Sequence, residues 1–344
     1  MTLPRRSTVG ALVVLLGLAM LGRSLWSRPR ILVLHSFRSE DPWVSGVDAG
    51  IRSVLAANRR PVSVTWHSMG LDRRTGADAR RVAAEDAKRE IALLSPDLII
   101  AVDDESNELV GREVARAGRS RVLYASIDRA PAGYGYGRGI AATGVAESLP
   151  LAGVRDAISA LHSGRSVRVA AIAADGETGR AELEQVRAFD WSPHRLVAAD
   201  AAGSFALWQE RASGSDADVL VVLSMAGLAR SVAAPARGAI DVVPAAEVVS
   251  WTESRPRALP IGTRPGWVAL GGALAIAPPA GPTGRLAMEM ALAWLDERDG
   301  SEPPPPVRTG HFDVELEASR LAARGFALPG VWVEAARLGD AARP

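Results

Sequence analysis

The chain opens with an uncharged apolar run at residues 9–22, and arginines stand on both sides of it. A basic segment before a short apolar run is typical of a secretory signal, and this run is short for a membrane helix, which needs ~20 residues. No small-residue cleavage site precedes Arg23. The pattern therefore predicts that residues 1–29 form either a cleaved signal peptide or an uncleaved hydrophobic helix that anchors an exported body.

From residue 31 onward, apolar runs of strand length alternate with amphipathic stretches of helical period. The run at residues 97–102 is apolar almost throughout, as in a strand buried in a parallel sheet. This order predicts a doubly wound α/β sheet, in which ligand-binding loops follow the carboxyl ends of the strands. Strands are expected at residues 31–35, 62–67, 97–102 and 122–127, and helices at 44–57, 77–94 and 106–117.

The same order of elements starts again after a Gly- and Pro-rich stretch at residues 131–144. Two α/β lobes that follow one another predict a crevice between them. Residues 226–264 show little regular pattern apart from one apolar run. In this second part, strands are expected at residues 167–173, 196–199, 219–223 and 258–261, and helices at 179–189, 205–212, 284–295 and 314–324.

The composition narrows the class of protein. The 344 residues include 40 basic and 39 acidic side chains, and this balance gives no reason to expect a nucleic-acid partner. The chain has no cysteine, which excludes disulfides, thiolate nucleophiles and lipid attachment through cysteine. Five histidines lack metal-binding spacing and no phosphate-binding glycine loop occurs, so neither a metal nor a cofactor is expected.

Polar and aromatic side chains follow the expected strands in both lobes. Because the carboxyl ends of parallel strands meet at one edge of a sheet, these side chains are expected to converge on the crevice and hold a small polar ligand. The alternative for each residue is a helix cap, since Ser and Asp after a strand commonly cap the next helix. The candidate ligand-binding residues are Ser36, Trp43, Asp103, Asp104, Ser126 and Asp128 in the first lobe and Asp175, Thr178 and Ser224 in the second.

The acidic candidates indicate what kind of ligand to expect. A metal site at Asp103, Asp104 and Glu105 is disfavoured, because adjacent carboxylates on a strand-to-helix turn point apart and an acidic first turn matches the helix dipole. Carboxylates instead favour a ligand with amino or hydroxyl donors, such as an amino acid or related amine. A hydrolase or transferase would need a nucleophile beside a base, and the sequence offers no such pair.

Five segments carry a resemblance to a known family. They are ILVLHSFRSEDPWVSGVDAGIRSVL at residues 31–55, PDLIIAVDDESNELV at 96–110, YASID at 124–128, VALGGALAIAPPAGPTGRLAMEMALAWL at 268–295 and FDVELEASRLAARGFALP at 312–329. These segments resemble the exported substrate-binding proteins of ABC transporters, which have the type I periplasmic-binding fold. More narrowly, they are similar to the branch whose domain also serves as the extracytoplasmic sensor of histidine kinases.

The resemblance implies two Rossmann-like lobes joined by a hinge that the chain crosses three times. It implies a first lobe of residues 30–143 plus about 268–300 and a second lobe of residues 144–267 plus about 301–340. By position, the six first-lobe candidates match the cleft-facing loops of the family, and the second-lobe candidates follow with less support. The family members are binding proteins that close their lobes on a ligand.

The sequence and the resemblance together predict a non-enzymatic, monomeric, periplasmic or otherwise extracytoplasmic protein. It is expected to close its lobes on a small polar ligand and present that ligand to an ABC transporter permease. The alternative is a ligand-sensing subunit, held at the membrane by residues 9–22, that signals through a separate membrane protein. A domain that binds protein in place of a small ligand also stays open at this stage.

Overall fold

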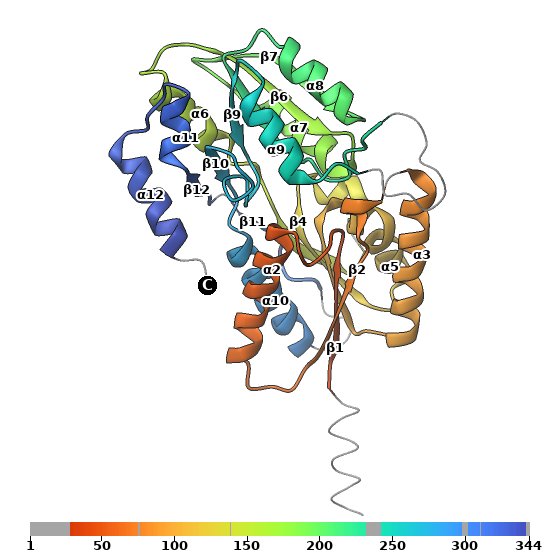
Figure 1. Cartoon of the computed structure of the whole chain (residues 1–344). Helices are drawn as coiled ribbons and strands as arrows, with labels where there is room; N and C mark the ends of the chain where they lie inside the picture. The colour runs from red at the N-terminus through yellow and green to blue at the C-terminus, as the bar shows by residue number, and fades with distance from the viewer. Residues whose placement is uncertain are drawn as a thin grey trace, which may run out of the picture.

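The computed structural model describes residues 28–74, 76–137, 139–231, 242–297, 302–309 and 311–341. It has two six-stranded sheets with helices on both faces, and the two lobes that they form stand one above the other in Figure 1. The expected two-lobed α/β architecture is therefore confirmed. The predicted signal or anchor helix within residues 1–29 lies outside the described residues, apart from Arg28 and Pro29. In the described part of the chain, no helix is long and apolar enough to cross a membrane.

The first sheet has the strand order β11-β5-β4-β3-β1-β2, and all of its pairs are parallel. Helices α2 and α10 cover one face, and α3 with the helical stretch from α4 to α5 covers the other. The strands are β1 (Arg30–His35), β2 (Ser63–Ser68), β3 (Leu98–Val102), β4 (Arg121–Ile127), β5 (Ala142–Ala146) and β11 (Val307–Arg308). The helices are α2 (Pro42–Ala57), α3 (Ala77–Leu94), α4 (Asp103–Ser106), the π-helical turn η2 (Asn107–Gly111), α5 (Arg112–Ala117) and α10 (Ala280–Asp296), with short 3-10 turns η1 (Leu71–Arg73) and η3 (Pro131–Tyr134).

The second sheet has the order β12-β10-β9-β8-β6-β7, in which only the β10 and β12 pair is antiparallel. Helices α6, α7, α11 and α12 contribute to the core on one face, and α8 and α9 to the core on the other. The strands are β6 (Arg168–Ala174), β7 (Arg195–Ala202), β8 (Val219–Val222), β9 (Leu259–Gly262), β10 (Leu274–Ala277) and β12 (Asp313–Leu316). The helices are α6 (Leu151–Leu161), α7 (Glu177–Ala188), α8 (Phe205–Gly214), α9 (Ala245–Ser254), α11 (Ala318–Ala323) and α12 (Gly330–Ala341).

Strand β1 shows why the central strands are apolar on both sides. Ile31 and Val33 pack with helices α2 and α10, whereas Leu32 and Leu34 point to the opposite face and pack with α3. Successive side chains of a strand alternate between the faces of its sheet, so a sheet covered twice needs an unbroken apolar run. Asp41 then begins helix α2, because its carboxylate accepts the backbone N–H groups of Trp43 and Val44 at 2.8 and 3.3 Å.

The sheets place three segments differently from the lobe division expected by resemblance. Strand β5 pairs with β4, so the first lobe continues to residue 146 and does not end at 143. Strand β10 pairs with β9 and β12, which puts residues 274–277 in the second lobe, and the chain returns to the first lobe only with α10. Strand β11 pairs with β5, so residues 307–308 belong to the first sheet. Such assignments depend on pairing between distant segments, which local sequence does not encode.

The tail differs from its predicted secondary structure as well. A helix was expected over residues 314–324, but β12 pairs antiparallel with β10 before the short helix α11 begins. The side chain of Glu315 points into the lobe, where it accepts the backbone N–H of Gly266 at 2.9 Å and that of Val268 at 3.3 Å. The helix predicted from residue 106 starts earlier, at Asp103, and the one predicted from residue 179 starts at Glu177.

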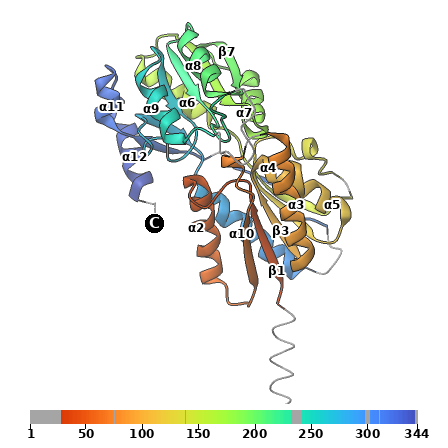
Figure 2. The ribbon, with the colours of Figure 1, turned by 45° about the vertical axis from the view of Figure 1, so that its right-hand side comes forward.

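Helices α2 and α10 lie side by side on the first lobe in both views of the ribbon (Figures 1 and 2). At their contact, a Cβ atom on Gly50 would lie 2.0 Å from the carbonyl oxygen of Gly281. Gly50→Ala is therefore expected to push the helices apart and lower the free energy of unfolding by about 2–3 kcal/mol, measured by chemical denaturation. Gly214→Ala at the end of α8 is the control, since its Cβ meets no atom within 4 Å. Equal effects of the two changes would contradict the close helix contact.

Candidate ligand-binding site between the lobes

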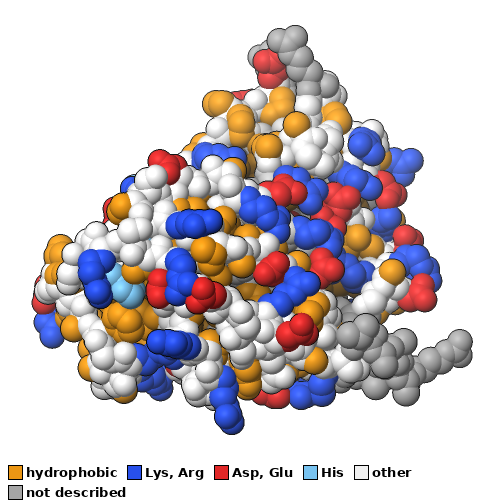
Figure 3. All heavy atoms as spheres, turned by 90° about the horizontal axis from the view of Figure 1, so that it is seen from above, with side chains coloured by type: hydrophobic (Ala, Val, Ile, Leu, Met, Phe, Trp, Pro, Cys, Tyr) orange, Lys and Arg blue, Asp and Glu red, His pale blue; other side chains and the backbone are white. Residues whose placement is uncertain are grey.

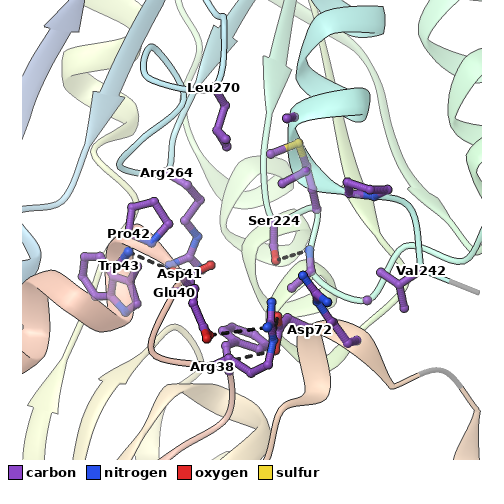
Figure 4. Close-up of a pocket in the computed structure, with 18 of the residues that line it drawn as sticks. Arg38, Glu40, Asp41, Pro42, Trp43, Asp72, Ser224, Val242, Arg264 and Leu270 are labelled. Atoms are coloured by element: carbon purple, nitrogen blue, oxygen red, sulfur yellow. Dashed lines mark hydrogen bonds and ion pairs between the residues drawn. The ribbon is translucent and has the colours of Figure 1, made fainter. Parts of the chain in front are cut away.

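A cavity of about 410 Å³ lies between the two lobes (Figure 4). The first lobe supplies a polar wall from the loops that follow β1, β2 and β3, including Arg38, Asp72 and Asp103. The second lobe supplies a mainly apolar wall from the loop after β8, the segment that leads into α9 and the segment after β9, including Met225, Val243 and Leu270. A volume of this size suits a small molecule that has both a polar and an apolar part.

Asp103 is the most deeply buried of the four acidic residues that line this cavity. It follows β3, is only 2% exposed, and its backbone has a left-handed conformation with φ of 70°. That conformation costs ~1–2 kcal/mol for a residue with a side chain, so the surrounding structure must hold it in place. Its Oδ2 atom is buried without a hydrogen-bond partner among the described residues. Burial raises the pKa of Asp103 well above its ordinary value, and the charge of Arg264 only partly offsets this.

Behind Asp103 lies a group of buried acids that we call the carboxyl cluster. Each member is at most 5% exposed. Arg264, in the loop after β9, is the cation that reaches them: its Nη2 atom lies 3.1 Å from Asp128 Oδ2 and 2.7 Å from Glu182 Oε1. Arg264 comes from the second lobe and Asp128 from the first, so this contact joins the lobes. The members of the carboxyl cluster are Asp103, Asp104, Asp128, Glu147 and Glu182.

The carboxyl cluster is held by hydrogen bonds but not saturated by them. Glu147 accepts the Ser126 hydroxyl at 2.6 Å, and Glu182 accepts the backbone N–H of Ser224 at 2.7 Å. Asp104 accepts the Tyr134 hydroxyl and, at 3.1 Å, the backbone N–H of Asp128. Asp104 Oδ2 and Glu147 Oε1 stay buried without any partner among the described groups.

Burial favours the protonated form of these acids. Desolvation, helped by the nearby Asp128 carboxylate, raises the pKa of Glu147 to about 8. Desolvation likewise raises the pKa of Glu182 to about 7, even though the charge of Arg264 lowers it. The pKa of Asp104 is also raised well above its ordinary value, first by burial and then by the charge of Asp128. The cluster therefore holds protons near neutral pH.

Trp43 forms an aromatic part of the first-lobe wall. Its ring is 4% exposed, and the guanidinium carbon of Arg264 lies 6.0 Å from the ring centroid. Its indole Nε1 is buried without a hydrogen-bond partner among the described residues. The cap of helix α2 at Asp41 fixes where this ring stands, and the close-up shows Trp43, Asp41 and Arg264 gathered on one side of the cavity (Figure 4).

The structure brings some of the sequence candidates to the cavity and uses others elsewhere. Trp43, Asp103 and Ser224 line the cavity, while Asp104, Ser126 and Asp128 lie in or against the carboxyl cluster. Two other candidates are hydrogen-bonded within the protein. Ser36 donates to the Val102 carbonyl at 3.0 Å and accepts the Ser106 N–H at 2.9 Å, and Thr178 donates to Glu105 at 2.7 Å. Asp175 is half exposed and pairs with Arg180 at 2.7 Å, so it lies outside the cavity wall.

Sequence reasoning missed three residues that define the electrostatics of this site. Glu147 follows β5, Arg264 follows β9, and Glu182 lies on α7. Glu147 and Arg264 stand directly after strands, where the same strand-end rule would have found them. Strand β5 falls largely in the Gly- and Pro-rich stretch, which hid this signal. Strand β9 matches the strand expected at residues 258–261, but the rule was not applied to the loop that follows it.

Thr178 is expected to stabilise the contact between the lobes. Its hydroxyl donates to buried Glu105 across the seam, from α7 of the second lobe to α4 of the first. Thr178→Val should lower the free energy of unfolding by about 1–3 kcal/mol, because the carboxylate loses its donor and stays buried. Thr65→Val on β2, whose hydroxyl makes no hydrogen bond within the described structure, is the matched control. An unchanged stability of the Thr178 variant in urea denaturation would contradict the interlobe contact.

The site shows no arrangement of metal ligands. Within the described ranges, no group of three His, Cys, Asp or Glu side chains is placed to hold a metal ion. On the face of the second lobe shown in Figure 3, basic, acidic and apolar side chains are interspersed, without the uniformly basic surface that nucleic acid would require.

Comparison with known structures identifies the fold. The chain shares the type I periplasmic-binding fold with solved substrate-binding proteins, and so the expected fold is confirmed. The ABC domain in complex with L-Trp from Streptococcus pneumonia is similar at 15% identity and a TM-score of 0.66, over 90% of this chain and 98% of that one. The ligand-free, open structure of CD0873, a substrate-binding protein with adhesive properties from Clostridium difficile, is similar at 12% identity and a TM-score of 0.57, over 88% and 96%.

A third similar structure is that of an assembly. The XylFII–LytSN complex matches at 16% identity and a TM-score of 0.51, over 83% of this chain and 97% of that one. No protein-family model matches the sequence, and no curated protein does. At these identities the likeness establishes the fold, and the function has to be argued from the site.

Proposed function

We propose that the protein is a solute-binding protein that closes its two lobes on a small ligand carrying an amine. The observation that carries the proposal is Asp103, which lines the interlobe cavity and whose Oδ2 atom is buried without a partner among the described residues. A buried acceptor of this kind costs free energy unless a donor reaches it. An ammonium group supplies a charge-assisted donor, and it is also attracted by the acids behind Asp103.

The opposite wall of the cavity indicates that the ligand also has an apolar part. Met225, Val243 and Leu270 of the second lobe face the polar first-lobe wall across the cavity. A ligand with an apolar body beside its amine would bury that body against these side chains while its ammonium group meets Asp103. Contact with both walls would stabilise the closed arrangement of the lobes. Only such a difference in ligand affinity between the open and closed forms can transmit ligand binding to a partner protein.

The proposed role is binding without chemistry, outside the cytoplasm, with delivery of the ligand to an ABC transporter permease. The fold is shared with substrate-binding proteins, and the polar residues described at the cavity offer no nucleophile paired with a base. The apolar run at residues 9–22 supports export.

Ligand sensing through a membrane partner is the second candidate. The absence of a small-residue cleavage site before Arg23 favours it, and the XylFII–LytSN complex shows a protein of this fold in a complex. N-terminal sequencing of the exported protein separates the two roles. A first residue beyond position 29 supports a diffusing carrier, whereas an intact N-terminus supports the anchored sensing subunit.

Ligand binding is tested by thermal shift of the purified protein with matched compounds. L-tryptophan and tryptamine carry an amine on an indole body, indole-3-propionic acid lacks the amine, and L-rhamnose lacks both the amine and the apolar body. An amine at about 100 times its Kd should raise the free energy of unfolding by about 2.7 kcal/mol, which shifts Tm by ~2–4 °C for a chain of this size. Shifts with the indole amines but not with the other two compounds support the proposal. Shifts with L-rhamnose alone would contradict it.

A further inference from the structure

The carboxyl cluster contains more acid than Arg264, the cation that contacts it among the described residues, can neutralise. Arg264 pairs with two of the five carboxyl groups, Asp128 and Glu182, and none of the five is more than 5% exposed. If all five were ionised, four negative charges would stay uncompensated in a region from which water is largely excluded. A buried charge without a partner is costly enough that the group binds a proton instead.

The hydrogen bonds also indicate that some of these acids are protonated. An ionised carboxylate only accepts hydrogen bonds, so every oxygen of a buried carboxylate needs a donor. Asp103 Oδ2, Asp104 Oδ2 and Glu147 Oε1 have none among the described residues. A proton on such an oxygen removes the need for a donor. Geometry and charge counting therefore agree that part of the cluster is protonated when no ligand is bound.

We infer that a cationic ligand that binds against Asp103 drives protons out of the carboxyl cluster, so that the affinity for the ligand rises with pH. This inference rests on the proposed function, because it needs a cation in the cavity. In the step, an O–H bond of one carboxylic acid breaks, its proton passes to the solvent buffer, and the carboxylate left behind is balanced by the ammonium group of the ligand. No covalent bond forms between the ligand and the protein.

The charged groups around the cluster set the direction of this coupling. Glu147, directly after β5, faces Ser126 of β4 and Asp128 just beyond it, Glu182 from α7, Arg264 from the loop after β9 and Asp103 from α4. Arg308 of β11 donates to the backbone carbonyl of Glu147 at 3.1 Å. Arg264 already pairs with the carboxyl groups of Asp128 and Glu182. A second positive charge would therefore act on the acids that lack a partner.

The other end of the cluster has the same excess of acid. Asp104 faces Asp128, Glu105 and Asp103, together with the Tyr134 hydroxyl. Asp41, at the start of α2, adds a further carboxylate near Asp103. A ligand cation lowers the pKa of the acids that it faces, and by linkage the protons on those acids weaken the binding of the cation.

The same linkage would make the protein sensitive to the acidity of its surroundings. At low pH the cluster is filled with protons and offers the ligand little negative charge. Burial raises the pKa of Glu147 to about 8, so the cluster gains this carboxylate as the pH rises above that value. Ligand would be held at neutral to alkaline pH and released on acidification.

Calorimetry measures the released protons directly. Tryptamine is titrated into the full chain at pH 7 in buffers that differ in ionisation enthalpy, and the slope of observed enthalpy against buffer enthalpy gives the number of protons exchanged. We expect release of about 0.5–1 proton per tryptamine bound, which corresponds to a roughly three- to tenfold gain in affinity per pH unit. Glu147→Gln should reduce the slope, whereas Asp78→Asn, at an exposed position on α3, should leave it unchanged. Binding with zero slope would overturn the inference and leave the proposed function intact.

Infrared spectroscopy of the ligand-free protein tests the first half of the inference without any ligand. The carbonyl-stretch band of protonated carboxylic acids should be present at neutral pH and weaker in the Glu147→Gln variant. Absence of that band would overturn the inference whatever the protein binds. Failure of the proposed function has a different signature, namely that no indole amine binds at any pH while the band is present.

Discussion

Asp103→Asn is expected to weaken tryptamine binding by roughly 30- to 150-fold, the largest effect on ligand affinity that we predict. The carboxylate supplies both the negative charge and the acceptor atom for the ammonium group, and a charge-assisted hydrogen bond of this kind in a buried site is worth ~2–3 kcal/mol. Asparagine keeps the size of the side chain. It also tolerates the left-handed backbone at this position, where φ is 70°, so the variant should fold.

Calorimetry of the Asp103→Asn variant beside Asp78→Asn checks this prediction. Asp78 is an exposed carboxylate on α3 of the same lobe. Its variant should bind tryptamine like the original protein. A cooperative unfolding transition in both variants shows that neither has lost its fold. Equal tryptamine affinity of both variants would show that Asp103 is not the acceptor for the amine.

Glu147→Gln is expected to make the ligand-free protein more stable at alkaline pH, by ~2–4 kcal/mol at pH 9. Burial raises the pKa of Glu147 to about 8, from an ordinary value of 4.5. Between these two values the folded protein binds a proton that the unfolded chain does not. Stability is therefore highest below about pH 4.5 for this group and is lost as the pH rises through about 8. The glutamine side chain does not ionise, so the variant keeps its stability as the pH rises through about 8.

Urea denaturation between pH 5 and pH 9 measures the effect. The original protein should lose stability across this range, and the Glu147→Gln variant should lose less.

Glu177 serves as a control, because its pKa is shifted in the opposite direction from that of Glu147. Burial alone would raise its pKa, but hydrogen bonds and charges from Arg180 and Arg129 outweigh burial and lower it, so its ionised form stabilises the fold above its ordinary pKa. Glu177→Gln should therefore lose stability at neutral pH. Parallel pH profiles of the Glu147 variant and the original protein would contradict a buried protonated acid.

The parts of the fold that local sequence determines were predictable. The apolar run at residues 97–102 predicted a buried strand, and β3 occupies it with every residue buried. Alternating strands and helices predicted the two lobes. The three crossings between the lobes were not predictable in detail, because the partner of β10 lies at residues 313–316 and that of β11 at residues 142–146. Such pairings depend on the assembled sheets.

The candidate site was predictable to a similar degree. The strand-end rule placed Asp103 and Trp43 near the crevice, since both follow strands of the first sheet. It could not tell the direction of a side chain: Ser36 follows β1 in the same way, yet its hydroxyl joins β3 to α4 inside the lobe. It also missed Arg264, although the preceding strand was expected at residues 258–261, because the search for donors and acceptors after strands was not extended to that loop. The charge balance of the cluster follows from that one arginine, so the sequence alone could not have indicated protonated acids.

A crystal structure of the protein with a bound indole amine tests the central claim most directly. We expect the ligand in the interlobe cavity, with its ammonium nitrogen within hydrogen-bonding distance of Asp103 Oδ2 and its ring between Trp43 and the apolar wall of the second lobe. A ligand bound elsewhere on the protein, or one in the cavity whose amine points away from Asp103, would contradict the account.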